Sequence, residues 1–278
     1  MLDSPDILGH CQDPAYRGGP GGRQTVIEEH IARFERFVDG FQTGLEGDDG
    51  HIRLKKEHSL HVLAEAQAIV PTLDMTSDQA RAALLAALYH DAGRFPQYRA
   101  YKTFKDSSSC NHAFLGVRAV RAEGLLARES PRVRGLALGA VVMHNRRTLP
   151  RGIPQELALV AGMLRDCDKL DIIRIMLEHL RPGGKRSEVV VLHLADEPRR
   201  CSPEVLAQVA SGRIGEYASM RYENDFKLLL LSWAHDLNTR AARRAFLERG
   251  HVRELFGLLP QSPELTQLHD TIYKVLDQ

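Results

Sequence analysis

The sequence predicts an all-α protein, and two observations support this prediction. Apolar residues recur at the three- and four-residue spacing of a helix in most stretches between breaks. Residues that favour helix starts, such as Ser, Asn and Pro, stand before several of these stretches. One stretch is an exception: residues 187–195 are rich in β-branched residues and fit a short strand or an extended piece. We therefore expect helices packed around one core.

Caps and breaks divide the first part of the chain into helices. A Gly- and Pro-rich lead-in comes first. Ser77 is the predicted N-cap of one helix, and Pro131 and Pro154 open two others. The polar and aromatic segment 94–110 is predicted to be a long loop. The predicted helices span residues 25–41, 51–70, 78–90, 111–126, 131–144 and 155–180.

The C-terminal part is also predicted to be helical, and no clear linker precedes it. Its predicted helices span residues 203–211, 222–237, 239–259 and 263–277. We divide the chain into a lead-in with the first helix (1–50), a helical core (51–182) and a helical extension packed on that core (183–278).

Six imidazoles and carboxylates fall on helix faces that are otherwise apolar. Asp168 lies one turn after Leu164 on the apolar stripe of the longest predicted helix. Asp166, about 200° away around the helix, is expected to point away from the core. The same projection predicts six inward side chains, which are His58, His90, Asp91, His112, His144 and Asp168.

These side chains predict a metal site. One inward histidine is commonly a hydrogen-bonded core residue, but an unpaired buried carboxylate costs several kcal/mol. Six such groups are reconciled most simply if they meet and share one or two divalent cations. Mixed imidazole and carboxylate ligands favour Mn, Fe, Co, Ni or Zn. Two more His-Asp pairs lack a matching set or fall on a solvated face: His235–Asp236 and His269–Asp270.

The order of the six residues resembles the H…HD…D signature of the HD-domain superfamily of metal-dependent phosphohydrolases. The segments "KKEHSLHVL", "YHDAGRFPQY" and "DCDKLDI" resemble its parts, and "NHAFLG" and "VVMHN" resemble the added histidines of branches with two metal ions. The similarity covers residues 52–176. It implies a multi-helix bundle whose first metal ligands are His58, His90, Asp91 and Asp168, with His112 and His144 at a second ion and Asp91 bridging both.

Two features limit the resemblance. His61, one turn from His58, is a rival for the first ligand position. The cyclic-dinucleotide phosphodiesterase branch has a His-His pair where this chain has His144–Asn145, and its GYP tripeptide is missing here. The resemblance therefore does not extend to that substrate.

The implied activity is hydrolysis of a phosphate mono- or diester of a small molecule, with a nucleotide as a candidate substrate, by a metal-activated water. The predicted catalytic residues are Asp91, Arg94, which would pair with a phosphate oxygen, and Lys169, at the family's basic position. Cations and aromatics alternate over residues 98–105, which fits a nucleotide grip or a packed loop. A metal- and nucleotide-binding regulatory module and a di-iron oxygenase would keep the same ligand set.

The composition and the absence of certain sequence patterns limit the classes of partner and the location that we expect. Lys and Arg number 37 and Asp and Glu 36, so the net charge of +1 gives no reason to expect an extended nucleic acid. No apolar run approaches the ~18–20 residues of a membrane span, and the N-terminus lacks a signal-peptide pattern. Four scattered cysteines favour a reducing, cytoplasmic location. The C-terminal third is predicted to cap the core, close the pocket or form a homodimer surface.

Overall fold

The computed structural model describes residues 22–181, 183 and 194–278, and these residues are predominantly helical. The all-α prediction is therefore confirmed. Within these ranges, β-pairing is limited to an isolated parallel bridge between Ala195 and Tyr222. Most of the β-branched run predicted as a short strand or an extended piece, residues 187–193, lies outside the described residues. Among the described helices, none combines the length and hydrophobicity that crossing a membrane requires.

The first part of the chain forms a bundle of helices. Its elements are α1 (Gly22–Asp39), α2 (Glu46–Ile69), η2 (Val70–Thr72), α3 (Ser77–Tyr89), α4 (Arg94–Tyr101), η3 (Asp106–Ser108), α5 (His112–Ala122), α6 (Pro131–Met143) and α7 (Gln155–Leu180). The cap of α3 is Thr76, not the predicted Ser77. The Thr76 hydroxyl accepts from the Gln79 amide (3.4 Å), and the Gln79 side chain accepts from the Thr76 amide (2.8 Å).

The segment predicted as a long loop contains α4 and the short helix η3. The prediction was wrong because it weighed the polar residues and overlooked the spacing of the aromatic ones. Phe95 and Tyr98 lie three residues apart, share one helix face and are buried. The helix ends at Tyr101, and the capping residue Lys102 has a left-handed backbone (φ 52°).

The C-terminal part is helical, but two predicted helices are broken. Its elements are α9 (Pro203–Ala210), η4 (Tyr217–Ser219), α10 (Glu223–Ser232), η5 (Trp233–Asp236), α11 (Arg240–Glu248), α12 (His251–Gly257) and α13 (Pro263–Leu276). The predicted helix 239–259 is divided at Gly250, whose φ of 74° ends α11 and starts α12. The predicted helix 222–237 continues beyond Ser232 as a 3₁₀ turn.

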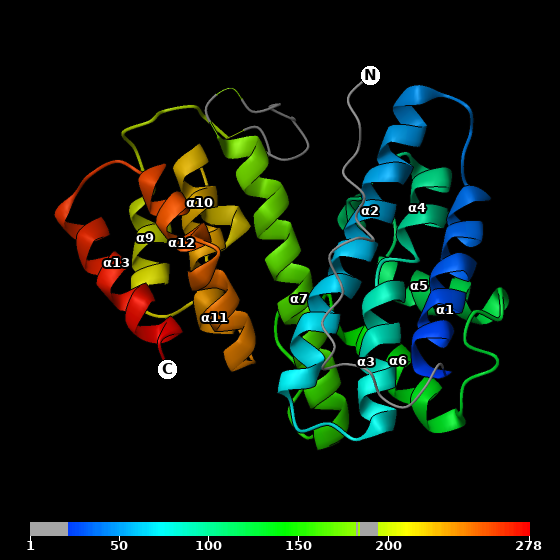
Figure 1. Ribbon diagram of the computed structural model, residues 1–278. Helices are drawn as coiled ribbons and strands as arrows, with labels where there is room; N and C mark the ends of the chain where they lie inside the picture. Colours follow the sequence, from blue (N-terminus) through cyan, green and yellow to red (C-terminus); the bar gives the residue numbers. More distant parts are fainter. Residues whose placement is uncertain (1–21, 182, 184–193) are drawn as a thin grey trace.

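Helix α7 lies between the two parts of the molecule (Figure 1). It packs against α2, α3 and α6 on one side and against α11 and α12 on the other. Asp166 is therefore fully buried, contrary to the prediction that it points away from the core. Its side chain meets the C-terminal part, and its carboxylate accepts hydrogen bonds from the backbone amides of Asn238 (2.9 Å) and Thr239 (2.7 Å).

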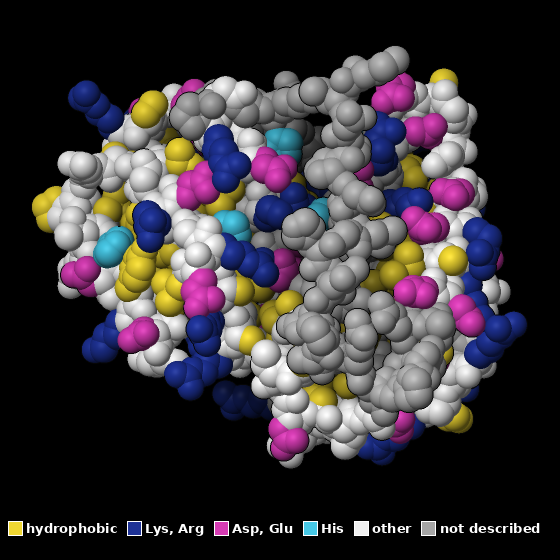
Figure 2. All heavy atoms as spheres, in the orientation of Figure 1, with side chains coloured by type: hydrophobic (Ala, Val, Ile, Leu, Met, Phe, Trp, Pro, Cys, Tyr) yellow, Lys and Arg dark blue, Asp and Glu magenta, His cyan; other side chains and the backbone are white. Residues whose placement is uncertain are grey.

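Charges of both signs are interspersed on the face over α7 and the C-terminal helices (Figure 2). Ion pairs also join the two parts. Arg181 of the α7 end pairs with Glu254 of α12 (2.5 Å), and Arg249 pairs with Glu65 of α2 (2.5 Å).

Candidate metal centre

The six predicted side chains come from five helices and the turns beside them. His58 lies within α2 and Asp168 within α7, whereas His90 and Asp91 follow α3, His112 begins α5 and His144 follows α6. Five helices thus meet at one point in the bundle, and all six residues lie there.

Gly93 lets the start of α5 approach the turn that carries His90 and Asp91. A Cβ atom at Gly93 would lie 2.1 Å from the carbonyl oxygen of His112 and 2.4 Å from the amide nitrogen of Gly116. Both neighbours are backbone atoms, so a residue with a side chain does not fit. This approach places His112 Nε2 3.4 Å from Asp91 Oδ1.

The six side chains form two adjacent groups. One ligand atom from each residue lies within 4.8 Å of the others in its group. The first group is His58, His90 and Asp168, and the second group is Asp91, His112 and His144. His61 belongs to neither group, so the structure places His58, and not its rival, beside the other residues.

In the first group, both imidazoles turn their Nε2 atoms inward. His58 Nδ1 lies 2.7 Å from Asp171 Oδ2, and His90 Nδ1 lies 2.8 Å from the carbonyl oxygen of Ala87. Because these oxygens only accept, the proton of each neutral ring sits on Nδ1 and leaves a lone pair on Nε2. The two Nε2 atoms are 3.2 Å apart, and His58 Nε2 is 3.1 Å from Asp168 Oδ1.

The second group repeats this arrangement. His112 Nδ1 lies 2.7 Å from Asp106 Oδ2, and His144 Nδ1 lies 2.7 Å from the carbonyl oxygen of Val141. The Nε2 atoms of the two rings are 3.0 Å apart. Each group therefore directs two nitrogen lone pairs and a carboxylate at one point, which is the geometry that a cation would satisfy.

Asp91 stands between the groups. Its Oδ2 lies 3.7 Å from His58 Nε2 and 3.8 Å from His90 Nε2. Its Oδ1 lies 3.4 Å from His112 Nε2 and 3.7 Å from His144 Nε2. The two oxygens of one carboxylate thus face different groups, as a bridging ligand requires.

Asp91 is held as an anion despite its burial. Burial alone would raise the pKa of its carboxyl, but the charge of Lys55, together with that of Arg94, prevails and holds the pKa well below its usual range. Lys55 Nζ lies 2.9 Å from Asp91 Oδ2 and 5.7 Å from the centre of the Phe104 ring.

The histidines of the two groups differ in their proton affinity. Burial lowers the pKa of His90 to about 4 and also lowers that of His112. Burial acts in the same direction on His58, but its hydrogen bonds with Asp168 and Asp171 raise its pKa above the ordinary 6.5. His58 therefore holds a proton more readily than the other two rings.

Arg94 is tied into the wall of the site. Its Nε lies 3.3 Å from Asp91 Oδ1, and its Nη1 donates to Gln97 Oε1 (3.1 Å), the carbonyl oxygen of Phe104 (2.5 Å) and Asp106 Oδ1 (3.0 Å). These contacts fix the segment after α4 against Asp91. A role in binding phosphate remains a prediction.

Lys169 lies beside Asp168 in the chain but points elsewhere. Its buried ammonium is 2.8 Å from Asp236 Oδ2, in the C-terminal part. Asp236 is one half of the second His-Asp pair, so this pair meets α7 through its carboxylate. The predicted catalytic role of Lys169 remains a prediction.

The alternating cations and aromatics in and just after α4 contact nearby side chains of the protein. The Arg99 guanidinium lies 4.4 Å from the centre of the Phe41 ring. Lys102 Nζ lies 2.5 Å from Asp48 and 5.4 Å from the centre of the Tyr98 ring. These contacts favour the packed arrangement over a nucleotide grip.

Three residues that contact the predicted ligand side chains were not identified from the sequence. Lys55 lies one turn before His58 and reaches the same face, a signal that helical spacing could have given. Asp171 lay near the inward stripe, three residues after Asp168, but its partner could not be identified. Asp106 gave no signal, because it falls in the segment predicted to be a loop.

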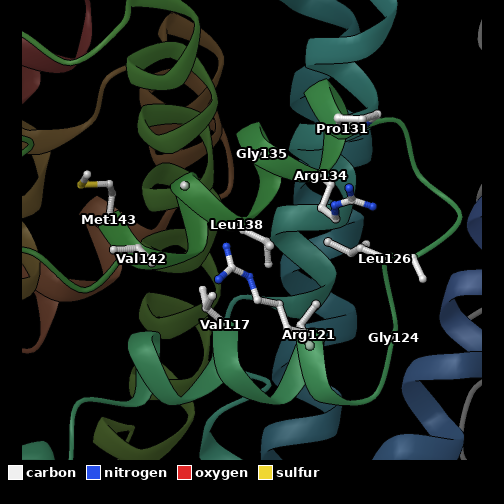
Figure 3. Close-up of a pocket in the computed structure, with 13 residues that line it drawn as sticks. Val117, Arg121, Gly124, Leu126, Pro131, Arg134, Gly135, Leu138, Val142 and Met143 are labelled. Carbon is white, nitrogen blue, oxygen red and sulfur yellow. The ribbon is translucent and has the colours of Figure 1, made fainter.

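A pocket of about 710 Å³ opens between α5 and α6. Apolar side chains and two arginines line it, and Figure 3 shows Val117, Leu138 and Val142 with Arg121 and Arg134 at the pocket. None of the residues that line it belongs to either His/Asp group.

Comparison with known proteins identifies a family. The model of the HD domain matches residues 56–200, which are 145 of the 278 residues. No curated protein and no solved structure matches the chain. The matched region contains all six residues of the two His/Asp groups. With more than half of its length matched and its helices arranged around these groups, the chain belongs to the HD-domain family.

Proposed function

We propose that this chain is a metal-dependent phosphohydrolase that cleaves a phosphate mono- or diester of a small molecule, with nucleotides as the first candidate class. The observation that carries the proposal is the position of Asp91, whose Oδ2 faces His58 and His90 and whose Oδ1 faces His112 and His144. A carboxylate placed in this way can join two cations. Paired cations about 3.5–4 Å apart commonly support phosphate ester hydrolysis.

The donor set fits divalent transition metals. Each group offers two imidazole nitrogens and one carboxylate oxygen, a mixture that suits Mn, Fe, Co, Ni or Zn. Hydrogen bonds at Nδ1 fix each ring, as is usual for metal-binding histidines. Bound there, the ions would supply a nucleophilic water near neutral pH and stabilise charge on the phosphoryl oxygens.

Two cationic side chains of this chain are proposed to bind the phosphoryl group of the substrate. Lys55 and Arg94 both contact Asp91, and their side chains are 20% and 16% exposed. Arg94 would bind a phosphoryl oxygen through its guanidinium, and Lys55 would act as a point charge. Lys169 has the weaker claim, because its ammonium is directed to Asp236 in the C-terminal part and not to Asp91.

The test combines metal content with a substrate panel. Elemental analysis of freshly purified protein should find a transition metal, and the metal-loaded protein should hydrolyse some members of a panel of nucleotides and phosphate mono- and diesters. Asp91→Ala should lose bound metal and at least about 10²-fold in activity. Asp270→Ala changes the exposed carboxylate of another His-Asp pair and is the matched control. Full activity in Asp91→Ala would refute the proposal.

The same experiment separates the two other interpretations. An intact panel together with tight nucleotide binding would indicate a regulatory module. Bound iron, with oxygen consumption in the presence of a polyol, would indicate an oxygenase. Neither has a structural observation of its own in its favour, because both would use the same six side chains.

A further inference from the structure

We infer that Asp236, in the C-terminal part, is a positioning residue for the second His/Asp group, acting through Arg165 on the turn that carries His144. The inference rests on the proposed function in one respect: the second group is taken to hold a metal ion. The second His-Asp pair of the sequence would then serve the metal centre from outside it.

Arg165 links the two regions directly. Its side chain is 5% exposed, and its Nη2 donates to Asp236 Oδ2 (2.6 Å) and to the carbonyl oxygen of Arg147 (3.1 Å). Its Nη1 donates to the carbonyl oxygens of Arg146 and His144, the latter at 3.4 Å. One guanidinium therefore holds three carbonyls of the turn 144–147 and one carboxylate of the C-terminal part.

The turn needs such a partner because α6 ends there. Carbonyl oxygens at and just beyond the end of a helix have no amide donor within the helix, and a cation beside them is favourable. His144 follows α6 immediately, and its Nδ1 is bound one turn back, to the carbonyl oxygen of Val141. The position of His144 Nε2 thus depends on how firmly the turn is held.

Asp236 is the anion that holds Arg165 in place. A buried guanidinium needs a counter-charge, and its loss leaves an uncompensated cation. Asp236 also accepts from Lys169 at 2.8 Å, so two cations of α7 converge on this one carboxylate. Neutralising Asp236 should let Arg165 move away from the turn and loosen it.

Two other links between α7 and the C-terminal part supply controls. Asp166 accepts hydrogen bonds from the Asn238 and Thr239 amides, only two and three residues after Asp236. Glu254 pairs with Arg181 at the far end of α7. Neither link includes a residue of the turn 144–147, so their loss reports general loosening between the two parts of the chain.

The experiment compares Asp236→Asn with Asp166→Asn and Glu254→Gln in the full chain. Hydrogen–deuterium exchange of the metal-free proteins should show at least tenfold faster exchange at residues 144–148 for Asp236→Asn alone. Titration with Mn²⁺ or Co²⁺ should show one of two binding events weakened by about 10–100-fold, the usual cost of losing an outer partner of a ligand. Asp236→Glu, which keeps the charge, should restore much of both readings.

The outcomes are decisive in each case. Unchanged exchange at residues 144–148 in Asp236→Asn, or an equal change in Asp166→Asn and Glu254→Gln, would overturn the inference. If Asp236→Asn does not fold, Arg165→Lys takes its place, because lysine keeps the charge but cannot hold three carbonyls and a carboxylate. If the wild-type protein binds neither ion, the proposed function fails alone, and the exchange measurement still decides the inference.

Discussion

The Nε2 atoms of His112 and His144 lie 3.0 Å apart, although the proton of each neutral ring is committed to an oxygen at Nδ1. No hydrogen bond can join two lone pairs, so the contact is favourable only when a cation lies between the rings. His58 and His90 repeat the relationship at 3.2 Å. Protons and metal ions therefore compete for the same nitrogen atoms.

The acceptors at Nδ1 should control the two groups separately. Asp171→Ala removes the partner of His58, and Asp106→Ala removes that of His112. We expect each change to weaken metal binding to its own group by about 10–100-fold. Isothermal titration with Mn²⁺ should show a different binding event affected in each variant. Loss of the same event in both would contradict the division into two groups.

Metal binding to the first group should be the more sensitive to acid. Burial disfavours the charged ring of His58, but Asp168 and Asp171 prevail and raise its pKa above 6.5. Burial lowers the pKa of His112 in the second group. As the pH falls from about 7.5 to about 6, protons should therefore displace the ion of the first group before that of the second.

The measurement is a Mn²⁺ titration at both pH values, with the event lost in Asp171→Ala marking the first group. The sign follows from competition, since a raised histidine pKa lets the proton compete at a higher pH. A larger acid-induced loss at the event that depends on Asp106 would contradict the prediction.

Gly93→Ala should damage both stability and the second group. The added Cβ would meet the backbone of His112 and Gly116 at 2.1 and 2.4 Å, so α5 must move. We expect a loss of about 1–3 kcal/mol in the free energy of unfolding, measured with urea, and weaker metal binding. Gly135→Ala, within α6 and with no atom within 4 Å of the new Cβ, should instead be neutral or gain about 0.5–1 kcal/mol.

Lys55→Met should weaken substrate binding more than metal binding. The ammonium contacts Asp91 and its side chain is 20% exposed, so a phosphoryl group entering the site would meet it under the proposed function. We expect KM for a hydrolysed ester to rise at least about tenfold while bound metal stays constant. Lys56→Met is the control, because Lys56 pairs with Glu35 and Asp39. Equal KM values in both variants would exclude this role of Lys55.

Helical projection predicted the convergence of the six side chains because most of the helices concerned bury one face. On α6 the apolar stripe leads to His144, and the structure places it with Asp91 and His112. On α7 the same reasoning put Asp168 on an inward face, and in the structure this residue lies 3.1 Å from His58. It misplaced Asp166, because α7 is buried on two sides. A projection assumes one core, and a helix between two layers violates that assumption.

Contacts between distant segments could not be predicted from the sequence. Nothing local indicates that Asp236 would bind Lys169 and Arg165, or that Asp106 would bind His112. The proposed division at residue 182 stays a prediction, and the family match, which ends at residue 200, runs past it. Such pairings depend on tertiary packing, which periodicity does not encode.

A chain cut after α7 would expose the side of this helix that packs against the C-terminal part. Gly162, whose Cβ would lie 3.2 Å from Asn238, and the fully buried Asp166 would both face water or a foreign surface. Such a fragment would tend to aggregate, because the surface of α7 that normally packs against α11 and α12 would be exposed. Any rearrangement of the gene that separated the two parts would therefore have to rebuild the outer side of α7.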